Sequence, residues 1–299
     1  MRKRAPNQVI SDLARLSGLT PSPVIETFAT TCELELRYFM EIGVVLEPKA
    51  LSVITLGHGR EFGDRVAQLI MDWGLDQDPR SLIADLQRSL DTWMLVRVAT
   101  DPQGRPQADL YFRKTHPLEE TVQWLAQHGV NEAEQQALRD LGRLAGTERT
   151  GILASSFRIG EPNLFKAYIH TRTGSGLSLG ERLHQCFEHF RIPGTGWRRM
   201  LAGLDQISGA AEADAYVSLL LGDGDAFDSL KLDLFHVDLR AFEDLARASG
   251  LVSSSAASVT DLGSSIGLTC AEHCGFRFSD QGDATLTAYF SSERALGDL

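Results

Sequence analysis

The feature that most constrains the fold is a strand–turn–strand unit that recurs five times along the chain. In each unit, two runs of strand-forming residues flank a short segment rich in Asp, Gly, Pro or Asn, a composition typical of β-hairpins. The units occupy 33–59, 92–113, 151–171, 214–237 and 267–292. Helical patterns separate them at 60–74, 117–129, 179–190 and 239–250. The sequence therefore predicts ten antiparallel strands interleaved with helices.

A long antiparallel sheet avoids exposed edges most simply by closing into a barrel. Helices in the connections would then cover its outer face, where the apolar strand positions would point. Ten strands leave a lumen too wide for side chains alone to fill. The predicted fold is therefore α/β: a ten-stranded antiparallel closed β-barrel of repeated αββα units surrounded by helices. Without a linker or low-complexity segment, residues 1–299 are expected to form a single domain.

The residues that would face this lumen are chemically mixed. In 163-NLFKAYIHT-171, Lys166, Tyr168 and His170 alternate with apolar residues and would share one side of a strand. Aromatic residues recur at the corresponding positions of other units, about 54 to 67 residues apart. These residues are Tyr111, Phe235 and Tyr289. A lumen lined by such residues is better suited to binding a ligand than to forming an apolar core.

Composition limits the partners. A net charge of −11 disfavours nucleic acid, which requires a basic surface. The basic N-terminus lacks the apolar core of a secretory signal, and no apolar run is long enough to span a membrane. The four cysteines, Cys32, Cys186, Cys270 and Cys274, are interpreted as reduced thiols. We therefore expect a cytoplasmic protein, working as a monomer, with neither a nucleic-acid nor a membrane partner.

The order of hairpins and helices resembles that of the ABBA prenyltransferases, whose fold is also called the PT barrel. Within that group the chain is most similar to the cyanobactin-type peptide prenyltransferases. The stretch 21-PSPVIETFATTCELELRYF-39 resembles their proline-led helix followed by a Cys-x-Leu-Glu strand, and 286-LTAYF-290 resembles their tyrosine-rich closing strand. The resemblance implies transfer of an isoprenyl group from its diphosphate to a side chain of a cyclic or linear, cyanobactin-like ribosomal peptide.

The resemblance also implies roles for particular residues. Glu35 matches the first-strand glutamate that sits near the acceptor, where a carboxylate can take the acceptor's proton. Inward basic residues stabilise the departing diphosphate, and aromatic faces shield the isoprenyl cation. The residues expected to bind diphosphate and prenyl groups are Tyr111, Arg113, Lys166, Tyr168, Lys231 and Tyr289.

Donor and acceptor preferences follow from the neighbouring positions. Ser218, Cys270 and His236 are expected to border the donor-length pocket, where small Ser and Cys side chains leave room for geranyl diphosphate or longer. The acids Glu33, Asp109 and Asp233 would line the acceptor side. Their charge favours a basic acceptor, an arginine or histidine side chain, with tyrosine or tryptophan as alternatives. The sequence shows no metal site of its own; Mg²⁺ is compatible with a diphosphate co-substrate.

Two rival functions remain open. The first keeps the fold but prenylates a small aromatic compound or a free amino acid. The second is a catalytically silent homologue that only binds peptide or prenyl ligands. Asp109 and Asp233 support the second, because they stand where relatives carry a lysine and a tyrosine and so leave the lumen poorer in cations. Structural roles also compete: Glu35 could pair with Arg37, and tyrosine is a common strand residue.

Overall fold

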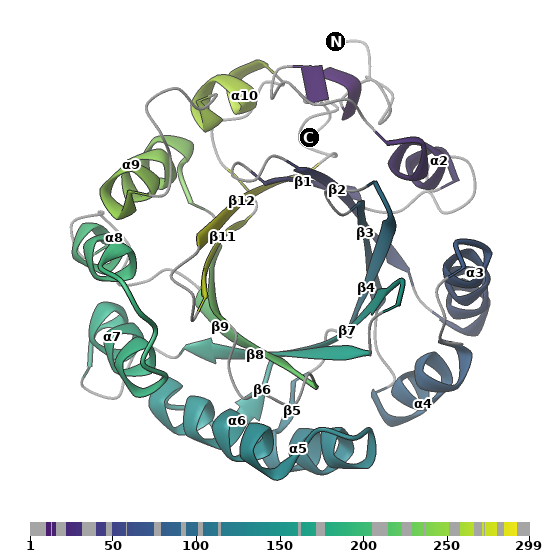
Figure 1. The fold of residues 1–299 in the computed structure, drawn as a ribbon, viewed down its shortest axis with the longest axis horizontal. Helices are drawn as coiled ribbons and strands as arrows, with labels where there is room; N and C mark the ends of the chain where they lie inside the picture. The colour runs from purple at the N-terminus through teal and green to yellow at the C-terminus, as the bar shows by residue number, and fades with distance from the viewer. Residues whose placement is uncertain are drawn as a thin grey trace.

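Ten strands close into a barrel in this computed structural model of the protein. Helices lie around the outside of the barrel (Figure 1). Every pair of neighbouring strands is antiparallel, and β1 pairs with β12 to close the sheet. The predicted fold is therefore confirmed. The structure describes residues 10–12, 14–15, 22–31, 40–45, 50–57, 59–74, 79–90, 94–100, 104–112, 115–160, 163–171, 177–204, 215–222, 229–235, 237–250, 258–265, 271, 273–279 and 284–291.

The barrel strands pair as the five predicted hairpins. They are β1 (Met40–Val45), β2 (Ala50–Gly57), β3 (Met94–Thr100), β4 (Pro106–Phe112), β7 (Ile152–Arg158), β8 (Leu164–Thr171), β9 (Ala215–Leu221), β10 (Ser229–Phe235), β11 (His273–Ser279) and β12 (Ala284–Ser291). The fifth hairpin begins later than expected, since Ala271 is not in a strand. Residues 32–39, where the first strand was expected to begin, lie outside the described residues.

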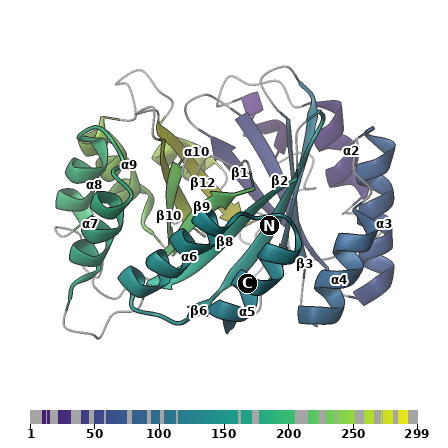
Figure 2. The same cartoon turned by 60° about the horizontal axis from the view of Figure 1, so that its bottom comes forward.

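Two helices, rather than the one expected, occupy each connection between successive hairpins, and α2 precedes the first hairpin. Together these helices surround the barrel (Figures 1 and 2), which gives the αββα repeat. The helices are α2 (Pro23–Thr31), α3 (Gly59–Asp72), α4 (Arg80–Leu90), α5 (Leu118–Gln127), α6 (Glu132–Ala145), α7 (Leu179–His189), α8 (Gly196–Leu204), α9 (Leu239–Ser249) and α10 (Val259–Ser265). A small separate sheet joins β5 (His116–Pro117) to β6 (Arg149–Thr150). Within the described chain, no helix is both long and apolar enough to cross a membrane.

Capping residues mark where several helices begin. Ser178 is the N-cap of α7, and its side chain and that of Glu181 form a reciprocal capping box. Asn131 caps α6 in the same way. Pro117 is the N-cap of α5, so the helix begins at Leu118, one residue later than the start at 117 predicted from the sequence.

The two faces of the strands differ in chemistry, as β10 illustrates. Leu230, Leu232 and Leu234 are fully buried in the core between barrel and helices. Lys231 and Phe235 alternate with them on the inner face and are only half-buried. Burial of the leucine row stabilises the closed barrel, since each buried leucine contributes roughly 1.5–3 kcal/mol. The apolar layer therefore lies outside the barrel, and the polar and aromatic row faces the lumen.

Candidate active site in the barrel lumen

One charge cluster is centred on Asp109 of β4. Its Oδ2 lies 2.8 Å from Arg97 Nη1, and its Oδ1 lies 2.9 Å from Lys166 Nζ. The Ser156 hydroxyl also donates to Oδ1, and the Tyr111 hydroxyl donates to Oδ2 over 3.2 Å. Both oxygens of this buried carboxylate are thus fully engaged, and we call these five residues the Asp109 cluster.

Burial and charge shift the pKa values in the Asp109 cluster. Burial alone would raise the pKa of Asp109, but Lys166 and Arg97 hold it well below its ordinary range. Burial lowers the pKa of Lys166 to about 7; Arg277 and Arg97 act in the same direction, and Asp109 opposes them. Burial and the neighbouring carboxylate raise the pKa of Tyr111. Lys166 is therefore easier to deprotonate than an ordinary lysine.

A second carboxylate–lysine pair lies on β10. Asp233 Oδ1 is 2.6 Å from Lys231 Nζ, and within the described part of the chain Lys231 is the one side chain that pairs with this buried carboxylate. Burial alone would lower the pKa of Lys231, yet Asp233 raises it, helped by Tyr289 and Tyr168. Gly275, opposite Asp233 on β11, makes room for the pair: a Cβ there would lie 2.8 Å from both Asp233 Oδ1 and Lys231 Cε.

Lys231 also lies between two tyrosines from strands that are not its neighbours. Its Nζ is 5.8 Å from the ring centroid of Tyr168 on β8 and 5.5 Å from that of Tyr289 on β12. Tyr289 fits against β1 because that strand has Gly43 opposite; a Cβ on Gly43 would lie 2.9 Å from the ring. Contacts that skip intervening strands show that these side chains meet inside the barrel.

A continuous series of rings runs along one side of the lumen from β8 to β12. Successive ring centroids are 4.9 Å apart for His170–Tyr216, 5.4 Å for Tyr216–Phe235, 5.0 Å for Phe235–His273 and 3.9 Å for His273–Tyr289. We call these five residues the aromatic arc. Each is buried or half-buried, so the arc is a wall of the lumen.

A fourth interior cation, Arg277 of β11, pairs in register with Lys231. Together with Arg97, Lys166 and Lys231, it gives these interior positions four cations against two carboxylates. In a lumen of low dielectric, this excess of positive charge can stabilise an anion strongly. The adjacent rings can stabilise an organic cation through their faces.

Comparison with known proteins places this geometry among characterised folds. No model of a known family matches the sequence, and no curated protein matches it. Among solved structures, the chain is similar to PriB with product diphosphate (TM-score 0.69, 13% identity, 97% of this chain and 95% of that one). It is also similar to PriB with L-tryptophan and dimethylallyl thiolodiphosphate (0.62, 14%, 96% and 95%). A third is 5-dimethylallyltryptophan synthase from Streptomyces coelicolor (0.59, 12%, 98% and 97%).

The chain folds as a PT barrel. The three similar structures cover nearly its whole length, and the closed ten-stranded order agrees with the barrel predicted from the sequence. At these identities the similarity concerns the fold, so the chemistry of this PT barrel has to be argued from its own lumen.

Most of the predicted site residues come together in that lumen. Those in the two charge clusters or against the rings are Asp109, Tyr111, Lys166, Tyr168, Lys231, Asp233 and Tyr289. Ser218 on β9 is directly opposite both Tyr168 and Lys231. The remaining predicted residues, Glu33, Glu35, Arg113, His236 and Cys270, lie outside the described residues. The roles assigned to all of them stay predictions.

Two interior cations of the PT barrel were missed by the sequence interpretation. Arg97 lies in 94-MLVRVAT-100 and Arg277 in 275-GFRFS-279, each a single basic residue between apolar ones. The signal that could have found them is the same alternation that identified Lys166. These arginines partly restore the positive charge that Asp109 and Asp233 remove.

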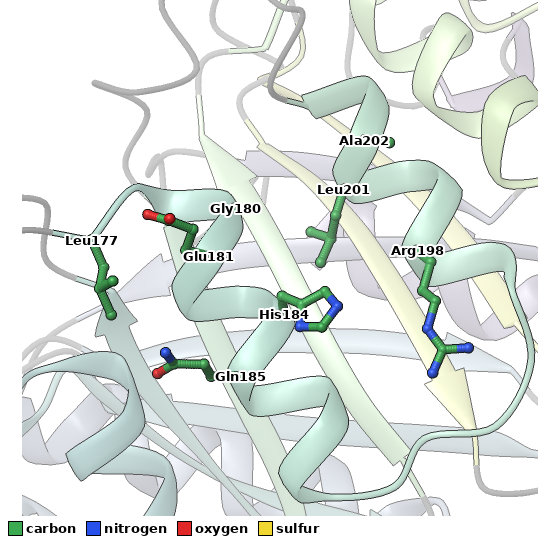
Figure 3. Close-up of a pocket in the computed structure, with 8 residues that line it drawn as sticks. All are labelled: Leu177, Gly180, Glu181, His184, Gln185, Arg198, Leu201 and Ala202. Carbon is green, nitrogen blue, oxygen red and sulfur yellow. The ribbon is translucent and has the colours of Figure 1, made fainter.

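A groove outside the barrel is a weaker candidate. It has a volume of about 500 Å³, lies between α7 and α8 (Figure 3), and is lined by Leu177, Gly180, Glu181, His184, Gln185, Arg198, Leu201 and Ala202. Two of its charged groups already have partners. Arg198 lies 4.6 Å from the Trp197 ring and 2.7 Å from Glu188, and Glu181 caps its own helix. The candidate active site is therefore the lumen.

Proposed function

We propose that the protein transfers an isoprenyl group from its diphosphate to an acceptor held in the barrel lumen. The observation that carries this proposal is the position of Lys231, whose ammonium lies between the rings of Tyr168 and Tyr289. Ionisation of an isoprenyl diphosphate produces an anion and an allylic cation side by side. A lumen that places a cation directly beside aromatic faces can stabilise both.

The diphosphate would lie among Lys231, Arg277, Lys166 and Arg97. Lysine and arginine donate charge-assisted hydrogen bonds to phosphate oxygens, and in a water-poor lumen these bonds lower the barrier to leaving-group departure. The described residues hold no group of three acidic, histidine or cysteine side chains that could bind a metal. Any Mg²⁺ would therefore be expected to enter with the diphosphate oxygens as its main ligands.

The donor would be geranyl diphosphate or longer. Ser218 supports this preference, because a small side chain stands directly between Tyr168 and Lys231 in the strand register. Replacing it in Ser218→Phe would fill that position with a ring. We expect the variant to turn over dimethylallyl diphosphate in preference to geranyl diphosphate, whereas a native enzyme that uses only dimethylallyl diphosphate would contradict the proposal.

The acceptor would be a side chain of a cyanobactin-like peptide. The electrostatic reason to favour arginine or histidine loses force, because Asp109 and Asp233 are each paired with a cation of the barrel. The aromatic arc instead favours a flat acceptor that can stack on it, such as a tryptophan or tyrosine side chain.

A second candidate acceptor is free tryptophan or a similar small aromatic. The comparisons favour it, since the similar structures include a complex with L-tryptophan and a dimethylallyltryptophan synthase. The same lumen and donor site would serve either acceptor, so the two candidates differ in what can enter the barrel.

Mass spectrometry of single-turnover mixtures tests these candidates together. The protein is incubated with dimethylallyl, geranyl and farnesyl diphosphates, with and without Mg²⁺, and with cyclic peptides containing Trp, Tyr, His or Arg, or with free tryptophan. A mass increase on one acceptor class identifies it. Binding of the donor without transfer to any acceptor would support the catalytically silent alternative and overturn the proposed activity.

A further inference from the structure

Gly151 lies where the chain passes from the small sheet into the barrel. It follows Thr150, which ends β6 and pairs with His116 of β5, and it precedes Ile152, which begins β7. The amide of Gly151 donates a hydrogen bond to the Tyr168 carbonyl over 2.9 Å, and Ile152 pairs in register with the same residue. The backbone of Gly151 is therefore held on both sides and has little freedom to move.

A ring of the aromatic arc occupies the space that a side chain at Gly151 would need. A Cβ there would lie 2.5 Å from Cε1 of Tyr216, whereas carbon atoms in contact are about 3.5–4.0 Å apart. Tyr216 belongs to β9, and β8 lies between β9 and β7, so the ring reaches across the end of β8 to Gly151. The Tyr216 ring can take this position because residue 151 has no side chain.

Tyr216 also lies close to the proposed donor site. The next residue on the same face of β9 is Ser218, about 7 Å along the strand, and Ser218 is directly opposite Lys231. The centroid of the Tyr216 ring is 4.9 Å from that of His170 and 5.4 Å from that of Phe235. An aromatic acceptor stacked on this part of the arc would therefore lie beside an isoprenyl group held near Lys231.

We propose that Gly151 and Tyr216 together determine how large an aromatic acceptor the lumen accepts. With only hydrogen at Gly151, the Tyr216 ring lies back toward β7 and leaves the arc open to the two fused rings of an indole. Because the Gly151 backbone is held in place, a methyl group there must displace the ring toward Phe235 and the space over the arc. A phenol still fits in the space that remains, whereas an indole does not. The inference rests on the proposed function, since it concerns the acceptor of that reaction.

A purely structural role for the contact between Gly151 and Tyr216 predicts a different result. If the Tyr216 ring only packed the end of the barrel, displacing it would lower stability and would slow transfer to every acceptor by the same factor. If the ring borders the acceptor, the larger acceptor loses more than the smaller one. One added methyl group in a binding pocket typically changes discrimination by about 10- to 200-fold. The ratio of two acceptors therefore separates the two roles.

The test measures kcat/KM with geranyl diphosphate for two cyclic peptides that differ only in carrying Trp or Tyr. The variants are Gly151→Ala, Tyr216→Ala and the double variant, and Tyr216→Ala alone decides the question if Gly151→Ala fails to fold. Calorimetric affinity for dimethylallyl thiolodiphosphate reports separately on the donor site. Gly203→Ala, in α8 outside the barrel, is the matched control, because its Cβ would also crowd a side chain, at 3.1 Å from Leu245 Cδ2.

We expect Gly151→Ala to lower the Trp-to-Tyr ratio of kcat/KM by about tenfold or more, with donor affinity unchanged within about threefold. Gly203→Ala should leave the ratio at its native value, and Tyr216→Ala should raise it. In the double variant, the alanine at 151 should have no further effect, because no ring is left for it to displace.

Three results would overturn the inference while leaving the proposed function in place. They are an unchanged ratio in Gly151→Ala or in Tyr216→Ala, the same fall in ratio when Gly151→Ala is added to Tyr216→Ala, and transfer by the native protein to neither the Trp nor the Tyr peptide but to another acceptor. Absence of transfer to any acceptor would instead overturn the proposed function, and the inference with it.

Discussion

The lumen contains two carboxylate–lysine pairs that differ in how completely they are satisfied. Asp109 receives two ion pairs and two hydroxyl hydrogen bonds from four different side chains. Asp233 pairs with Lys231 alone among the described residues. The first pair is built as a structural anchor across β3, β4, β7 and β8. In the second pair, Lys231 has no other ion-pair partner among the described residues, which suits a cation that binds a ligand.

The largest expected effect is on the free energy of unfolding when each carboxylate is removed in turn. Asp109→Asn would leave Arg97 and Lys166 buried without their counter-ion, and breaking a buried pair in this way costs about 3–5 kcal/mol. Asp233→Asn should cost less than Asp109→Asn, because Asp233 has one cationic partner where Asp109 has two. Urea unfolding measures both. Equal losses in the two variants would contradict the comparison.

The two lysines should differ in donor binding. Lys231→Met is expected to weaken the affinity for dimethylallyl thiolodiphosphate by about 10- to 100-fold, the loss of a charge-assisted hydrogen bond. Lys166→Met should weaken it less than about tenfold, because the Lys166 ammonium is already bound to Asp109. Isothermal titration calorimetry gives both values, and circular dichroism controls for folding. A larger loss in Lys166→Met would reverse the assignment of roles.

Filling the space beside the second pair should disturb it without removing a charge. A Cβ at Gly275 would lie 2.8 Å from Asp233 Oδ1 and Lys231 Cε, so Gly275→Ala must push the pair aside. Overpacking of this kind costs about 1–3 kcal/mol. Donor affinity should fall with stability. In the double variant Gly275→Ala/Asp233→Asn the two effects should not add; simple additivity would show that Gly275 does not act through the pair.

The smallest expected effect is on the pH dependence of donor binding. The pKa of Lys166 is lowered to about 7, so in the free protein this lysine is charged below pH 7 and loses its charge above it. A bound diphosphate favours the charged form. The affinity should therefore be highest below pH 7 and fall less than about tenfold as the pH rises to 9. Lys166→Arg keeps its charge throughout and should flatten the profile; an equally steep profile in that variant would assign the titration to another group.

The sequence predicted the strands of the barrel better than it predicted the surrounding helices and all of the inward cations. Alternation such as Phe165-Lys166-Ala167-Tyr168 identified the strands and predicted which side would be polar. The second helix of each connection escaped notice, although Asn131 and Glu134 form a capping box that marks the start of α6. Arg97 and Arg277 were missed because single basic residues within apolar runs look like interruptions of a buried strand.

The sequence by itself determined the local structure: its period-two alternation and turn residues specify five hairpins, and its caps specify where several helices begin. Only the tertiary structure decided which lumen charges meet. Asp109 and Lys166 are 57 residues apart in the chain, and Tyr289 reaches Lys231 across a strand. The physical reason is closure. Because the apolar face of each strand is buried against the helices, its polar face points into the barrel. The stagger of the closed sheet then determines which of these inward residues lie close enough to form ion pairs.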